Sequence, residues 1–152
     1  MSSTFLDNRE RRQTVHDAIL TAGLVPVGME RFAASTLPTV QECGAQVRGC
    51  DWLIGILAYR YGWIPKGEDR SITEIEYDTA KEAGMPRLMF VIDSSLKVDP
   101  HADFDQGPDR WEKQKKLDAF KAKVGADQMP AVFKEETLGI RVLAAIQAEL
   151  AR

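Results

Sequence analysis

The sequence predicts an α/β fold in which helices cover both faces of a parallel sheet. Segments 51–62 and 86–93 are apolar runs that are too continuous for strands with one face in water, and they are typical of strands buried on both faces. Segments with the 3.6-residue spacing of amphipathic helices precede and follow these runs. Strands that alternate with helices indicate a parallel sheet between two helical layers, and 152 residues suit a single domain spanning 1–152.

The residues ahead of the first apolar run predict two helices and one weak strand. Thr4 or Asp7 can cap a helix that stops at Gly23. Segment 24–29 is short and apolar, and its proline restricts it to an edge strand. A second helix follows and ends near Gly49. The apolar run at 51–62 is then expected to form the centre of the sheet.

Beyond that run, the pattern alternates helix and strand to the end of the sequence. The stretch from 94 to 108 is rich in Asp, Pro, Ser and Gly, which favours a loop. The predicted elements are a helix at 70–84, a strand at 86–93, the loop, a helix at 110–125, a strand at 129–134 and a helix at 137–152.

The start of the sequence lacks the strand that such a sheet needs. In a doubly wound sheet the first strand normally lies in the middle, yet only Met1 to Thr4 precede the first helix. We expect the first central strand to be missing or truncated. A shortened start, a strand fragment and pairing by another chain all explain this, and the first is favoured. Bare apolar surface and unpaired edges at this gap predict self-association.

Composition excludes several functions. The formal net charge of -3 gives no footprint for nucleic acid, and Arg9, Arg11 and Arg12 are expected on a solvated helix face. No apolar run approaches the roughly 18 residues of a membrane span, and no secretory signal is visible, so we expect a cytoplasmic protein. No glycine-rich phosphate loop is present, which argues against hydrolysis of nucleoside triphosphates.

The sequence indicates no metal site and no resident cofactor. His16 and His101 lack cysteine or acidic partners at ligand spacing. Cys43 and Cys50 are seven residues apart on a predicted helix, which is typical of buried core thiols rather than of a disulfide or a metal pair.

Glu76 is a carboxylate on the inward face of its predicted helix. Ser71 and Glu74 fit an S-x-x-E capping box, and Glu74 projects outward. Glu76 instead lies within roughly 40° of the middle of the inward stripe. An inward carboxylate either bonds to a neighbouring loop or an arginine, or works at the wall of a cleft. The stripe consists of Ile72, Ile75, Thr79 and Ala83.

Several phrases together resemble the DUF4062 family, which is found at the N-terminus of STAND-type NTPases. They are SSTFLD, VPVGMERF, C-x6-CD-WLIGILAYRYG and S-x-TEIEYDTAKEAGMP-x-LMFVID, and the resemblance covers nearly the whole chain. Members usually carry an apolar strand ahead of SSTF. They also carry an acid directly before the arginine that matches Arg12, where this sequence has Arg11.

The resemblance implies a three-layer flavodoxin/TIR-like fold and a function for Glu76. The family is similar to TIR domains and nucleoside deoxyribosyltransferases, whose shared glutamate is followed by Ala at +4 and, in some TIR domains, Gly at +8. Glu76, Ala80 and Gly84 fit that spacing. The resemblance thus implies an N-glycosidase in which Glu76 attacks the anomeric carbon or stabilises an oxocarbenium-like transition state, with NAD as the expected substrate. A non-catalytic signalling or oligomerisation module and a deoxyribosyltransferase-like enzyme are the alternatives.

Topology predicts which residues surround a nucleotide or nucleoside at this site. Residues that follow parallel strands meet at the carboxyl edge of the sheet, where ligands of such folds bind. Hydroxyl and backbone N–H groups can hold phosphate or ribose, and aromatic rings can stack on a base. Arg60 can equally clamp Glu74 or Glu76, and Trp63 can simply pack the loop. The predicted substrate-binding residues are Ser2, Ser3, Thr4, Arg60, Tyr61, Trp63 and Ser71.

Overall fold

The computed structural model describes residues 1–29, 37–96, 98, 99, 101 and 103–152. Three positions of the predicted loop at 94–108 and the last residues of the phrase VPVGMERF lie outside the described residues. In chain order the elements are α1 (Arg9–Thr21), α2 (Thr39–Arg48), β1 (Leu53–Leu57), α3 (Ile72–Glu82), β2 (Arg87–Ile92), α4 (Arg110–Asp127), β3 (Ala131–Phe133), the 3-10 helix η2 (Glu135–Thr137) and α5 (Leu138–Leu150).

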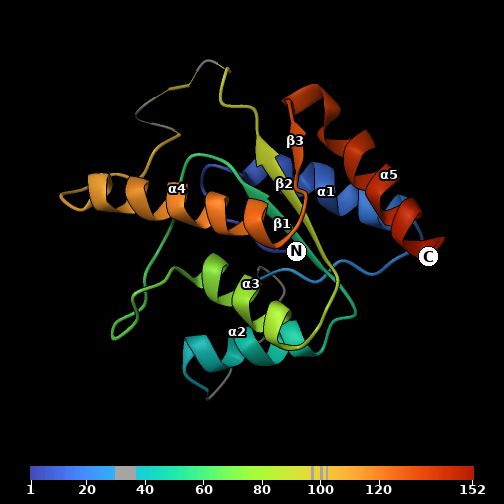
Figure 1. Cartoon of the computed structure of the whole chain (residues 1–152), viewed down its shortest axis with the longest axis horizontal. Helices are drawn as coiled ribbons and strands as arrows, with labels where there is room; N and C mark the ends of the chain where they lie inside the picture. The colour runs from blue at the N-terminus through green and yellow to red at the C-terminus, as the bar shows by residue number, and fades with distance from the viewer. Residues whose placement is uncertain (30–36, 97, 100, 102) are drawn as a thin grey trace.

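The strands form a parallel sheet with helices on both faces, as the sequence predicts (Figure 1). Successive side chains of a strand point to opposite faces. Ile54 and Ile56 therefore pack in one core with α1 and α5, whereas Leu53 and Leu57 pack in a second core with α2, α3 and α4. All five residues of β1 are buried, which explains why its sequence is a continuous apolar run.

The centre of the sheet is β2 rather than β1, so the expectation that segment 51–62 forms the centre is wrong. The strand order is β1-β2-β3, and Leu53 pairs with Arg87 at the start of the first ladder. On its other side, β1 has a single isolated parallel bridge, between Ser2 and Gly55. That side of β1 carries too little pairing to place it inside an extended sheet.

The described N-terminal residues contribute this one bridge to the sheet. The Ser2 N–H donates to the Ile54 carbonyl at 2.8 Å, and the Ile56 N–H donates to the Ser2 carbonyl at 3.0 Å. Beyond it, the Met1 ammonium donates to the Val27 carbonyl at 2.8 Å. The N-terminal residues therefore lie between β1 and the segment at Val27, with one bridge in place of a ladder.

The predicted edge strand at 24–29 does not form. Residues 24–28 have no regular secondary structure. Pro26 has no N–H to donate, and the neighbouring segment offers a single bridge instead of a strand, so a ladder has no template at this place. In place of the predicted strand, the structure has an irregular segment that contacts the N-terminus through Val27.

Helix starts follow local hydrogen bonding. Ser71 caps α3, and its hydroxyl accepts the Glu74 N–H at 3.3 Å, as the capping pattern predicts. The N-cap of α1 is Asn8 and not Thr4 or Asp7, because the Thr4 hydroxyl donates to the Asp7 carboxylate instead. Among the described helices, none is long and apolar enough to cross a membrane.

Candidate functional site around Glu76

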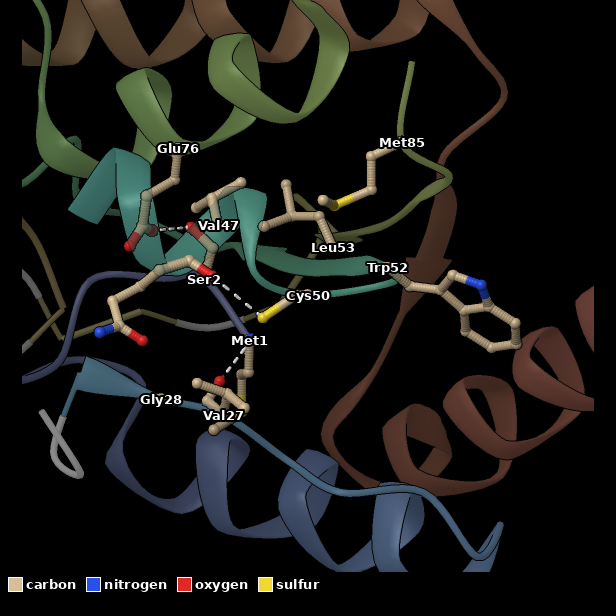
Figure 2. A pocket seen from close by; sticks show the side chains of 11 residues that line it. Met1, Ser2, Val27, Gly28, Val47, Cys50, Trp52, Leu53, Glu76 and Met85 are labelled. Carbon is tan, nitrogen blue, oxygen red and sulfur yellow. Dashed lines mark hydrogen bonds between the residues drawn. The ribbon is translucent and has the colours of Figure 1, made fainter. Parts of the chain in front are cut away.

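Glu76 lies on the inward face of α3, as its position in the helical stripe predicts. The residue is 6% exposed. Its Oε2 accepts a hydrogen bond from the hydroxyl of Ser2, 74 positions away in the sequence. Figure 2 shows the Glu76 side chain reaching from α3 toward Ser2, while the Met1 ammonium bonds to Val27 on the other side of the N-terminal segment. Ser2 is thus the predicted binding residue that the fold brings to Glu76.

A small cavity adjoins the Glu76 carboxylate. Its volume is about 20 Å³, which is enough for roughly one water molecule. Its wall combines the N-terminal residues Met1 and Ser2 with side chains of α2, β1 and the segment at Val27 and Gly28. The Trp52 ring extends away from Glu76 (Figure 2). In this conformation a water molecule fits beside the carboxylate and a nucleotide does not.

Burial governs the electrostatics of the site. It raises the pKa of Glu76 above the ordinary value of 4.5, and the Ser2 hydrogen bond, the Met1 ammonium and Arg12 oppose that rise. Burial and the negative charge of Glu76 raise the pKa of the Cys43 thiol on α2 to about 11. A low-polarity environment on the α2 side and two positive charges on the N-terminal side therefore act on the same carboxyl group.

Ser3 and Thr4 belong to a neighbouring network around α1. The Ser3 hydroxyl accepts from Arg12 Nη1 at 2.9 Å and donates to the Thr4 carbonyl at 2.9 Å. The Thr4 hydroxyl donates to Asp7 and accepts from the Asn8 side chain at 3.0 Å. Arg12 is only 5% exposed, so its expected place on a solvated helix face is wrong. The hydroxyl groups predicted for ribose or phosphate are thus engaged within the domain.

Tyr61 and Ser71 form a second network, centred on Glu74. The Tyr61 hydroxyl donates to the Glu74 carboxylate and accepts the Ser71 N–H at 3.1 Å. Burial, together with Glu74, raises the pKa of Tyr61 to about 12. Lys123 of α4 also binds Glu74, with 2.5 Å between Nζ and Oε1. Tyr61 and Lys123 thus clamp the outward-facing carboxylate of the helix.

The loop ahead of α4 covers the carboxyl end of β1. The Asp105 carboxylate accepts the N–H groups of Tyr61 at 2.7 Å and Gly62 at 3.3 Å. Arg60 Nε donates to the Asp103 carbonyl at 3.4 Å. These backbone donors are of the kind expected to hold a phosphate, and here a carboxylate from the chain itself binds them. Trp63 is 59% exposed at the same edge.

Sequence reasoning missed Met1, Arg12 and Asp105. Met1 acts through its terminal ammonium, and Asp105 acts through a long-range loop contact, so neither has a local sequence signal. Arg12 does have a local sequence signal, because it lies at helical spacing from the buried residues Val15 and Ile19. Among the described residues, no group of three or more His, Cys, Asp or Glu could hold a metal ion.

Comparison with known proteins identifies the chain at the level of family. No curated protein and no solved structure matches it. A family model described as a domain of unknown function, DUF4062, matches residues 1–147. This match includes α1 through most of α5, and with it Ser2, Glu76 and every other predicted site residue. The chain therefore belongs to the DUF4062 family.

Proposed function

We propose that this protein is a TIR-like nucleotide N-glycosidase that hydrolyses NAD and releases nicotinamide, with Glu76 as the carboxylate at the anomeric carbon. The observation that carries the proposal is a buried carboxylate held by one hydroxyl group beside a water-sized cavity. Burial of a carboxylate is costly, and such groups concentrate at functional sites.

The reaction needs one negative charge and one water molecule. The bond between ribose C1′ and the nicotinamide nitrogen breaks, and its electron pair leaves with nicotinamide, which becomes neutral. The ionised Glu76 stabilises the positive charge that develops at C1′. Water then adds to C1′ and releases a proton, which yields ADP-ribose. No strong general acid is required.

The substrate gains access to Glu76 only when the N-terminal segment moves. Met1 and Ser2 close the cavity; the Ser2 backbone forms the bridge to β1, and the Met1 ammonium bonds to Val27. Opening the closure breaks these hydrogen bonds, which contribute about 1 kcal/mol each, and also the Ser2–Glu76 bond. In the open form the Ser2 hydroxyl is free to bind ribose.

The cellular setting is part of the proposal. Cys43 and Cys50 are both free thiols, which is typical of a reducing compartment and favours the cytoplasm. In this proposal the chain is a signalling or effector domain of a STAND-type protein. The domain itself binds the nucleotide and self-associates. A nucleoside deoxyribosyltransferase-like reaction uses the same carboxylate, but its donor is a deoxynucleoside and its acceptor is a free base.

A second candidate is a non-catalytic signalling or oligomerisation module. The closed state of the site favours it, because Glu76 is 6% exposed and the adjoining volume is about 20 Å³. In this case the Ser2–Glu76 hydrogen bond fixes the N-terminal segment to α3. Replacing Glu76 by alanine would then lower the free energy of unfolding without changing any turnover.

The test is nicotinamide release from NAD by wild-type protein, Glu76→Gln, Ser2→Ala and the control Glu82→Gln. Glu82 lies on the same helix and is exposed, so its variant removes a charge without touching the cavity. We expect wild-type and Glu82→Gln to release nicotinamide and Glu76→Gln to release none while remaining folded by circular dichroism.

Product analysis separates the alternatives. Adding a free purine base to a deoxynucleoside substrate distinguishes transfer from hydrolysis, because a new deoxynucleoside forms only by transfer. If wild-type protein cleaves neither NAD nor any nucleoside, even when clustered at high concentration, the enzymatic proposal is contradicted. The non-catalytic signalling module is then the remaining candidate.

A further inference from the structure

Segment 61–63, which follows β1, presents consecutive backbone N–H groups at the carboxyl edge of the sheet. The Tyr61 N–H donates to Asp105 Oδ2 at 2.7 Å, and the Gly62 N–H donates to Asp105 Oδ1 at 3.3 Å. Gly62 has φ +92°, and a left-handed residue of this kind can direct successive N–H groups at one anion. The Trp63 N–H, the next along the chain, has no hydrogen-bond partner among the described residues.

The ammonium group of Lys121 lies at the same edge. Lys121 Nζ on α4 donates to the Ala58 carbonyl at 2.6 Å, three residues before Tyr61 in the chain. Burial lowers the pKa of Lys121, and the neighbouring Asp118 opposes that fall. Within the described part of the chain Lys121 forms no ion pair, so its ammonium group has donors to spare. A partly buried cation without a carboxylate partner favours an anion as its ligand.

Asp105 already shows what kind of group segment 61–63 binds. It comes from the loop between β2 and α4, 44 positions from Tyr61, and each of its carboxylate oxygens accepts one N–H. Two oxygens of a phosphate group can make the same pair of contacts. A carboxylate has only two oxygens and one charge, whereas a diphosphate has two charges and several more acceptors. A diphosphate can therefore also serve the Trp63 N–H and the spare donors of Lys121.

We propose that segment 61–63 and Lys121 bind the diphosphate group of a dinucleotide, and that Asp105 occupies this site as a built-in competitor. The anion site is argued from the contacts of the chain itself. The identity of the ligand rests on the proposed function, because NAD contains a diphosphate. Binding exchanges one oxyanion for another at the same N–H groups, so the free protein holds its own inhibitor.

Tyr61 connects this anion site to the helix that carries Glu76. Its backbone N–H belongs to the site, while its hydroxyl group donates to Glu74 and accepts the Ser71 N–H at 3.1 Å. Ser71 is the N-cap of α3. A diphosphate held at segment 61–63 is thereby fixed to the beginning of α3, on whose inward face Glu76 lies.

The experiment titrates the isotope-labelled full chain with ADP-ribose and, separately, with inorganic pyrophosphate. The amide signals of Tyr61, Gly62 and Trp63 are followed by NMR. We expect all three signals to shift saturably with ADP-ribose, because the ligand replaces the Asp105 carboxylate at the first two N–H groups and adds an acceptor at the third. ADP-ribose carries no glycosidic bond to nicotinamide, so this measurement does not depend on turnover.

A matched pair of acidic residues tests the competition. Asp105→Asn removes the competing charge and should tighten ADP-ribose binding about tenfold, because the open site is then populated more often. Asp109→Asn removes the same charge from an exposed residue of the same loop, which pairs with Lys113 instead. Asp109→Asn should bind like wild-type protein.

A matched pair of lysines on α4 tests the cation independently. Lys121→Met keeps most of the side-chain volume and removes the charge, so it should weaken ADP-ribose binding about tenfold. Lys115→Met, at an exposed position of the same helix, should leave binding unchanged. The wild-type and Lys121→Met titrations carry the test if Asp105→Asn loses its fold.

Three results would overturn the proposal. The first is that the amide signals of segment 61–63 do not move at millimolar ADP-ribose while the rest of the spectrum shows a folded protein. The second is that Asp105→Asn and Asp109→Asn tighten binding equally, since overall charge would then explain the gain. The third is binding of pyrophosphate without ADP-ribose, which would assign the site to a free inorganic anion. If ADP-ribose binds as described but wild-type protein releases no nicotinamide from NAD, the proposed catalysis fails and this binding site stands.

Discussion

At the scale of single residues, the pair formed by Ser2 and Glu76 joins the start of the chain to its third helix. The carboxylate is buried, and the hydroxyl that bonds to it comes from a segment with one bridge to the sheet. The protonation state of Glu76 therefore depends on how firmly the N-terminal segment is held. A charged Glu76 favours an open, hydrated site, and a neutral one favours the closed form.

The raised pKa of Glu76 makes part of the stability depend on pH. A carboxyl group whose folded-state pKa lies above its ordinary value of 4.5 binds its proton more tightly in the folded state. Its stabilising contribution is complete below pH 4.5 and is lost as the pH rises through the folded-state pKa. Urea unfolding should show that wild-type protein loses stability relative to Glu76→Gln over this range. A stability difference that is independent of pH, or that grows in favour of wild-type protein, contradicts the assignment.

The two thiols should differ in reactivity. Cys43 is 1% exposed and its pKa is about 11, whereas Cys50 is partly exposed. Because the thiolate is the reactive form, iodoacetamide at pH 8 should alkylate Cys50 well before Cys43. Peptide mapping by mass spectrometry measures both rates, and urea should make them equal. Equal rates in the folded protein would mean that the side of α2 next to Glu76 is open to solvent.

At the scale of elements, α3 is held between two kinds of contact. Its inward face carries Glu76 and apolar side chains, while its outer face forms ion pairs with α4. Lys123 lies 2.5 Å from Glu74 and 2.8 Å from Asp78, and it also lies over the Tyr77 ring at 5.8 Å from the centroid. These contacts set the position of α3, and therefore of Glu76, against the sheet.

Removing Lys123 should loosen this attachment. Lys123→Ala leaves two partly buried carboxylates without their shared cation, and we expect a loss of about 1–2 kcal/mol in the free energy of unfolding. Lys115→Ala, at an exposed position of the same helix, should change it by less than about 0.5 kcal/mol. Chemical denaturation measures both variants. An equal effect in both would remove the ion pairs from the account of how α3 is positioned.

The turn after β1 is tested by two glycines with similar backbone angles. Gly62 has φ +92°, and a Cβ at this position would lie 2.6 Å from Thr4 Cγ2. Gly67 has φ +88° with open space around it. Gly67→Ala should cost about 1 kcal/mol from backbone strain alone, and Gly62→Ala should cost clearly more. Equal unfolding free energies for the two variants would show that the N-terminal segment does not pack on this turn as described.

At the scale of the whole molecule, hydrophobic patterning was enough to predict the layers. The apolar runs identified β1 and β2, the helical stripes identified α1 to α5, and the inward position of Glu76 followed from spacing. Pairing was harder to predict, because whether segment 24–28 joins a sheet depends on its neighbour and not on its own residues.

The candidate site was predictable only in part for the same reason. Glu76 and Ser71 carry local signals of helix face and cap. Asp105 reaches Tyr61 from 44 positions away, which no local pattern encodes. The hydroxyl groups of Ser3 and Thr4 bond to α1 and the turn ahead of it, a choice that tertiary packing decides.

One ionised carboxylate carries the proposed reaction, so the most direct measurement is the rate of nicotinamide release from NAD across pH by wild-type protein and Glu76→Gln. We expect wild-type protein to release nicotinamide with an acid limb above pH 4.5, because the pKa of Glu76 is raised, and the variant to release none. Equal release by both proteins, or none by either when both are folded, would contradict it.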